Sequence, residues 1–165
     1  MKFDIYIELI RINYTLGSIV FPVIDFPASW DERAEEFGYE TIEELYDYFV
    51  NILVNQTMIN ELRSEFPSTT IFTIPTGWST LKLAQMYEEN LLLDAISIFG
   101  PKPTSLFTDQ KGHQGQIAIE TGTLVWLQSI YNIDLTTNIY ETGFNTDLHD
   151  IAKEVTDNHD PNYKQ

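Results

Sequence analysis

The stretch T69-T-I-F-T-I-P-T-G77 is the segment from which the fold class of this chain can be predicted. It is a short β-branched run with one aromatic residue, and Pro75 and Gly77 bring it to an end. A strand of a parallel sheet has this composition, because helices bury both of its faces. The stretch therefore predicts a buried strand over residues 69–74, followed by a loop at residues 75–78.

A long helical pattern precedes this strand. Thr41 is a candidate N-cap with Glu44 at the capping-box position, and apolar residues recur near helical spacing until Pro67. A helix over residues 41–65 would span roughly 37 Å, which is long for a small domain. We therefore expect this helix to break near residues 55–57.

Further helices are expected after the strand. Ser79 is a candidate N-cap for a second helix, and residues 91–99 are apolar and predicted to be helical. Residues 116–131 are apolar almost all round, which predicts a well-buried helix. Thr146 is a candidate N-cap for a last helix, in which apolar residues recur at helical spacing from Leu148.

Two apolar runs near the N-terminus predict further strands. Residues 3–9 alternate between apolar and polar side chains, and residues 18–24 form a weaker pattern that Pro22 interrupts. Strands and helices in this order predict a single α/β domain over residues 1–165, with a mainly parallel sheet. In such folds, functional residues gather on loops that follow the carboxyl ends of strands.

The charge of the chain argues against two classes of partner. There are 25 acidic and 9 basic residues, which give a net charge of −16. Binding to nucleic acid or to anionic lipid needs patches of Lys and Arg, so no nucleic acid and no membrane is expected as a partner. Solubility is the interpretation of the acidity that we favour. The absence of cysteine excludes disulfides, cysteine zinc sites and a thiol nucleophile.

Charged residues near the N-terminus argue against a signal peptide. Lys2, Asp4, Glu8 and Arg11 interrupt any apolar core there, and no apolar run long enough for a transmembrane helix occurs elsewhere. We therefore expect a soluble chain that is cytoplasmic by default.

The stretch L106-F-T-D-Q-K-G-H-Q-G-Q116 carries the candidate chemistry. A carboxylate such as that of Asp109 can hold one ring N–H of His113, which fixes the tautomer and makes the histidine a better base. Gly112 would let the backbone turn tightly between them. Asp and His at this spacing also occur in ordinary surface turns, and on spacing alone a turn is the more frequent explanation.

Other candidate groups give weaker signals. His149 and His159 have acidic neighbours but no tight metal-ligand spacing, and no glycine-rich phosphate loop occurs, so no metal and no cofactor is expected. Ser18 and Ser79 lie near glycines and are candidate nucleophiles. However, no helical pattern directly follows Ser18, and Ser79 is better explained as a helix cap.

The order of these pieces resembles the C-terminal half of SGNH (GDSL-like) hydrolases, over about residues 41–160. The shared pieces are a strand, a helix, an Asp–His segment, an apolar helix with a Trp, and a last helix: I71-F-T-I-P-T-G77, L106-F-T-D-Q-K-G-H113 and L148-H-D-I-A-K-E-V155 carry the resemblance. It implies an α/β fold, a partial or compact three-layer α/β/α sandwich. It also implies that Asp109 orients His113 as the general base of a serine ester hydrolase acting on a small-molecule ester or acylated substrate.

Three features depart from that family. Three residues separate Asp109 from His113 where the family has two, no Gly-Asp-Ser-like block is present, and residues 1–40 do not resemble the family's start. These departures leave open a truncated or degenerate relative, for which we expect self-association through an unpaired sheet edge. The alternative is a non-catalytic acidic α/β domain, either a pseudo-enzyme or a protein-binding module.

Overall fold

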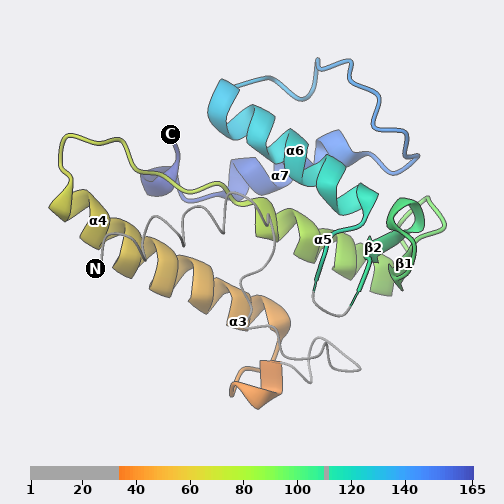
Figure 1. Ribbon diagram of the computed structural model, residues 1–165, viewed down its shortest axis with the longest axis horizontal. Helices are drawn as coiled ribbons and strands as arrows, with labels where there is room; N and C mark the ends of the chain where they lie inside the picture. Colours follow the sequence, from red (N-terminus) through yellow and green to blue (C-terminus); the bar gives the residue numbers. More distant parts are fainter. Residues whose placement is uncertain (1–33, 110–111) are drawn as a thin grey trace. The chain divides into compact units, whose positions relative to one another are not determined.

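The computed structural model describes residues 34–109 and 112–165, so the strands expected over residues 3–9 and 18–24 lie outside the described part of the chain. The described chain combines helices with one small parallel sheet, which makes it a mixed α/β protein (Figure 1). None of its described helices is long and apolar enough to cross a membrane.

The described residues form two compact units. The one that we call the larger unit holds residues 75–109 and 112–158. The smaller unit joins residues 34–74 to the C-terminal residues 159–165. The C-terminal end of the chain therefore belongs to the same unit as the first described helices.

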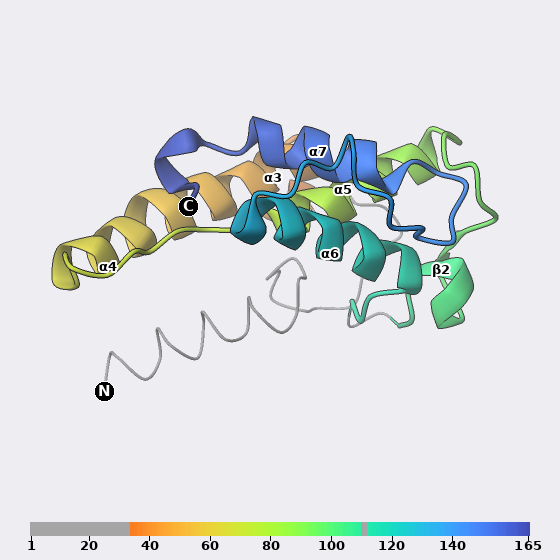
Figure 2. The ribbon, with the colours of Figure 1, turned by 90° about the horizontal axis from the view of Figure 1, so that it is seen from above.

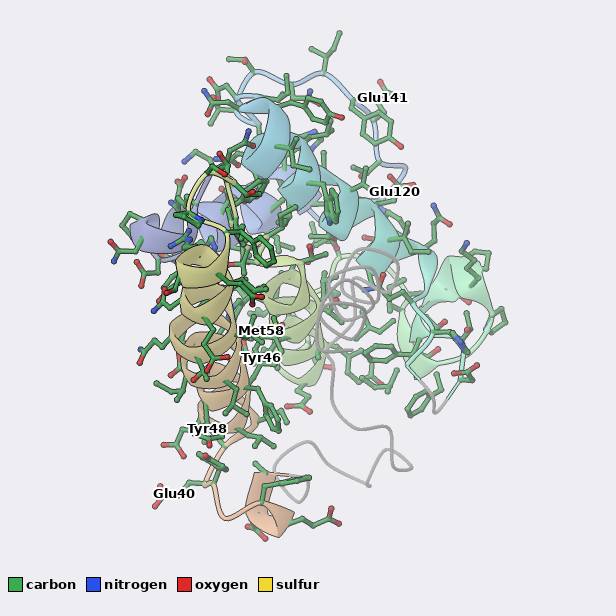
Figure 3. The ribbon with its side chains drawn as sticks, turned by 60° about the vertical axis from the view of Figure 1, so that its left-hand side comes forward. Glu40, Tyr46, Tyr48, Met58, Glu120 and Glu141 are labelled. Atoms are coloured by element: carbon green, nitrogen blue, oxygen red, sulfur yellow. The ribbon has the colours of Figure 1, made fainter. Side chains whose placement is uncertain are left out.

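The smaller unit is built on one continuous helical segment. The segment consists of α3 (Ile42–Asp47), the π-helix η1 (Tyr48–Ile59) and α4 (Asn60–Glu65). Thr41 caps it as predicted, because its Oγ1 accepts a hydrogen bond of 3.3 Å from the backbone N of Glu44. Figure 3 shows Tyr46, Tyr48 and Met58 along this segment.

The expected break near residues 55–57 does not occur. The chain keeps a helical path there, with π-type geometry in place of α-helical geometry. Thr57 Oγ1 accordingly donates to the carbonyl of Ile52, five residues earlier, over 2.9 Å. The helix therefore changes its type over residues 48–59 and is not interrupted.

A chain of polar side chains links this segment to the C-terminal residues. Asn51 Nδ2 donates to Asp47 Oδ1 over 2.6 Å, and Asn55 Nδ2 donates to Asn51 Oδ1 over 3.1 Å. Thr73 Oγ1 lies 3.0 Å from Asn55 Oδ1 and 3.1 Å from His159 Nε2. Because Asn55 and His159 are both buried, these bonds satisfy polar groups that would otherwise be costly inside the protein.

The stretch over residues 69–74 is not a strand, so this prediction is wrong. Its backbone groups bond to a side chain and to the C-terminal residues instead of to a neighbouring strand. Arg63 Nε and Nη2 both donate to the carbonyl of Ile71, over 2.9 and 2.6 Å. The backbone N of Thr73 donates to the carbonyl of Tyr163 over 2.9 Å.

Three α-helices form the core of the larger unit. They are α5 (Thr76–Glu88), α6 (Gln116–Tyr131) and α7 (Leu148–Asn158). The three helices pack against one another, and Figures 1 and 2 show α6 and α7 side by side. The predicted positions of α6 and α7 are confirmed by the bounds of the two helices, and most of the apolar residues that predicted them are buried.

The starts of α5 and α7 differ from the prediction. Ser79 is not the N-cap of α5, because the helix already begins at Thr76 and Ser79 Oγ donates to the Thr76 carbonyl over 2.7 Å. Thr146 does not cap α7, because its backbone N and Oγ1 donate to Asp94 Oδ2 over 2.9 and 2.7 Å. Asp147 takes the capping role, since its Oδ1 accepts a backbone N–H from the first turn of α7 over 3.0 Å.

The sheet has two short parallel strands, β1 (Ser97–Phe99) and β2 (Ser105–Phe107). The helix expected over residues 91–99 is therefore wrong, since no helix forms there and the segment ends as β1. Only residues 100–104 connect the two strands, although parallel strands usually need a longer crossover. Each strand has only three residues, so these connecting residues can span the distance from the end of β1 back to the start of β2. In the described residues, the mainly parallel sheet that was expected is reduced to this pair.

Candidate active site

The Asp–His loop, residues 107–114, leads from β2 toward α6. An antiparallel bridge between Phe107 and Gln114 joins its two ends. The backbone N of Thr108 also donates to the carbonyl of His113 over 2.7 Å. These contacts close the loop into a hairpin whose two arms lie side by side.

Asp109 and His113 are brought together across this hairpin. Asp109 Oδ2 lies 2.5 Å from His113 Nδ1, and the backbone N of His113 donates to Asp109 Oδ1 over 3.4 Å. Gly112 makes part of the turn between them with a φ of +80°, in the left-handed region that glycine adopts without strain. The two residues that the sequence singled out are thus direct neighbours in space.

Both side chains of the pair are open to solvent, with 61% of His113 and 44% of Asp109 exposed. Solvent screens such a pair, so it stabilises the fold by no more than about 1 kcal/mol. Its effect is instead to orient the ring. A carboxylate that accepts from the ring selects one tautomer of the neutral imidazole, in which Nδ1 carries the proton and Nε2 keeps its lone pair.

Gln114 connects the Asp–His loop to α5. Its Nε2 donates a 3.2 Å hydrogen bond to Thr80 Oγ1, and only 1% of Thr80 is exposed. Neighbouring residues of an extended arm point to opposite faces, so Gln114 faces α5 while His113 faces solvent. Neither Thr80 nor Gln114 could be identified from the sequence, because polar residues 34 positions apart give no pattern.

Gly115 is a further residue whose role could not be predicted from the sequence. It lies directly before α6, and its backbone N donates to the carbonyl of Leu106 over 2.7 Å. A Cβ added to Gly115 would lie 1.7 Å from the carbonyl oxygen of Ser105, far inside van der Waals contact. The close approach of β2 to the start of α6 therefore requires glycine at this position.

The remaining candidates have other partners or lie outside the described residues. Ser18 belongs to the part that is not described, and Ser79 is buried with its hydroxyl bonded inside α5. His149 Nε2 lies 3.2 Å from Asn138 Oδ1, and His159 belongs to the smaller unit. No group of three or more His, Asp or Glu side chains that could hold a metal occurs in the part of the chain that the structure describes.

Comparison of the chain with protein-family models, with curated proteins and with solved structures found no match in any of the three. These comparisons therefore neither support nor oppose the resemblance to SGNH hydrolases. We infer the function from the chemistry of the Asp–His loop.

His159 is buried, and burial changes its protonation. Its Nε2 lies 3.1 Å from both the Oγ1 and the carbonyl oxygen of Thr73. Burial lowers the pKa of His159 below its ordinary value of 6.5. The carbonyl of Thr73 and the charge of Asp160 act in the opposite direction, and the charge of Lys164 adds to the lowering. The neutral ring is thus the form that the folded smaller unit favours.

We expect the smaller unit to lose stability as the pH falls below about 6.5. Below that value His159 is protonated in the unfolded chain. In the folded chain it stays neutral until the pH falls to its lower folded-state pKa. The stabilisation is therefore complete above the unfolded-state pKa and declines as the pH falls toward the folded-state pKa. His159→Gln, which keeps an N–H donor and does not titrate, should flatten this decline. Urea midpoints at about pH 7.5 and about pH 5.5 measure it, and an equal decline in both proteins would contradict this role of His159.

Proposed function

We propose that this chain is an SGNH-like serine ester hydrolase, or a part of one, in which Asp109 and His113 form the acid–base pair. The observation that carries the proposal is the 2.5 Å contact between Asp109 Oδ2 and His113 Nδ1, which leaves Nε2 as the proton acceptor. The parallel pair β1–β2, with α5 and α6 in contact with it, supports a partial three-layer α/β/α sandwich as the fold.

The proposed reaction is the hydrolysis of a small-molecule ester. His113 Nε2 takes the proton of a serine hydroxyl, and the serine oxygen attacks the ester carbonyl. Asp109 stabilises the imidazolium, which then gives its proton to the departing alcohol, and water later releases the acyl group with the same help. The hydroxyls of Ser79, Ser97 and Ser105 donate to backbone carbonyls, so we assign none of these three as the nucleophile.

Hydrolysis of p-nitrophenyl acetate by the whole chain tests this proposal. His113→Gln should lower kcat/KM about a hundredfold or more, because a positioned general base contributes at least that much. Asp109→Asn should also lower kcat/KM, because an amide neither fixes the tautomer nor stabilises the imidazolium. His149→Gln is the matched control, since it removes a histidine that contacts Asn138 instead of Asp109, and it should leave the rate unchanged.

Two outcomes would overturn the proposed hydrolase. One is a wild-type rate equal to that of free imidazole at the same concentration. The other is an equal rate in the wild type and His113→Gln, which would place any hydrolysis outside the Asp–His loop.

A second candidate function is that of a non-catalytic acidic α/β domain that binds a protein partner. The high exposure of His113 favours it, since 61% of the side chain lies open to solvent. So does the observation that, among the described residues, no serine is hydrogen-bonded to the His113 ring. This candidate predicts background hydrolysis by the wild type and by all three variants, with every protein folded.

A further inference from the structure

The geometry points to Thr80 and Gln114 as positioning residues that hold His113 in the orientation of a general base. This inference rests on the proposed function, because it assigns an orienting role to two residues that touch no reacting atom. Neither residue belongs to the Asp–His pair. Their contact links the Asp–His loop to the buried side of α5.

The contacts of Gln114 fix one arm of the hairpin from two directions. Its backbone is held by the bridge to Phe107, and its side chain is held by the 3.2 Å hydrogen bond to Thr80 Oγ1. Thr80 is 1% exposed and lies within α5, so it is a fixed point. Rotation of the arm would break the bond between Gln114 and Thr80 inside the protein, where water does not replace it freely.

The exposure of the Asp–His pair explains why an anchor, the hydrogen bond between Gln114 and Thr80, is needed. The contact between Asp109 and His113 is screened by solvent, so by itself it favours one orientation of the ring without fixing it. Gln114 is the immediate neighbour of His113 and faces the opposite side of the arm. While Gln114 stays bonded to Thr80, the His113 side chain is directed to solvent beside Asp109. Without this bond, the arm would twist and the ring would leave the carboxylate for part of the time.

The experiment measures the tautomer of His113 by nitrogen-15 NMR of the neutral ring, together with kcat and KM for p-nitrophenyl acetate. In the wild type, the proton should reside on Nδ1. Thr80→Val keeps the shape of the side chain and removes the hydroxyl acceptor, and Gln114→Met removes the donor. Each variant should shift His113 toward a mixture of tautomers and lower kcat about tenfold with little change in KM. Thr80→Ser, which restores a hydroxyl, should recover both quantities.

Thr156→Val is the control for the general cost of changing a buried threonine. Thr156 is buried, and its Oγ1 donates to the Ala152 carbonyl within α7 instead of to a residue of the Asp–His loop. If Thr80→Val behaves like Thr156→Val in both tautomer and kcat, the anchor is overturned while the proposed hydrolase stands. A tautomer shift in Thr80→Val with no hydrolysis by any protein would support the anchor and overturn the hydrolase.

Discussion

Gly115→Ala is expected to destabilise the larger unit by at least about 4 kcal/mol. The new Cβ would lie 1.7 Å from the carbonyl oxygen and 2.7 Å from the carbonyl carbon of Ser105. Both are backbone atoms of β2, so no side-chain rotation relieves the overlap. The hydrogen bond of 2.7 Å from Gly115 N to the Leu106 carbonyl holds the two segments at this separation. Relief therefore requires β2 and the start of α6 to move apart.

Urea unfolding followed by circular dichroism measures this loss of stability. Gly143→Ala is the matched control, because Gly143 has a φ of +78° and nothing within 4 Å of an added Cβ. Alanine at position 143 would adopt the left-handed backbone conformation without any steric overlap. We expect the free energy of unfolding of this variant to fall by about 1–2 kcal/mol. A loss for Gly115→Ala no larger than that for Gly143→Ala would show that β2 and α6 separate easily.

Arg63→Met is expected to destabilise the smaller unit by about 3 kcal/mol. The guanidinium donates twice to the carbonyl of Ile71, over 2.9 and 2.6 Å, and once to the carbonyl of Asn162, over 2.9 Å. It also lies 5.2 Å from the centre of the Tyr163 ring, within the range of a cation–π contact. Methionine keeps much of the apolar stem, so the change removes chiefly the charged group. Arg63→Lys should be nearly as harmful, because one ammonium does not reproduce the planar fork.

Hydrogen exchange at the amide of Thr73 reports this change directly, since that amide donates to the Tyr163 carbonyl. We expect faster exchange in Arg63→Met, together with a lower urea midpoint. Lys82→Met is the control, because Lys82 pairs with Glu154 at 2.9 Å on a partly exposed surface. Loss of that pair should cost less than about 1 kcal/mol. Wild-type exchange rates in Arg63→Lys would disprove the role of the guanidinium fork.

The parts of the fold that could be predicted from the sequence are those whose signal is local. The apolar spacing of α6 and α7 and the cap at Thr41 each lie within one element, and the structure has all three. The strand predicted over residues 69–74 is wrong because β-branched composition does not distinguish a strand from an irregular segment, which here is exposed at residues 69–70 and half-buried at residues 71–74. The partners that decide this, Arg63 and Tyr163, lie on either side of the stretch, and Tyr163 is distant in sequence.

The same difference between local and distant signals applies to the candidate site. Asp109 and His113 could be proposed together because they share one short loop, and proximity along the chain becomes proximity in space. The bond between Thr80 and Gln114 joins two elements whose packing no local pattern reveals. Gly115 was missed because a glycine before a helix is common, and only the position of the Ser105 carbonyl shows why it is required.

The hydrogen bonds along the chain of polar side chains in the smaller unit all have the same donor-to-acceptor direction. The carboxylate of Asp47 accepts from Asn51, so Asn51 turns its amide N–H toward Asp47 and its carbonyl toward Asn55. Asn55 in turn offers its carbonyl to Thr73, which commits the single hydroxyl hydrogen of the threonine. Thr73 Oγ1 can then only accept from His159, so the neutral ring carries its proton on Nε2. The carbonyl oxygen of Thr73 lies 3.1 Å from the same nitrogen and can also only accept. The hydrogen bonds that begin at a surface carboxylate, and pass through three intervening side chains, therefore agree with the tautomer that the backbone selects for the buried ring.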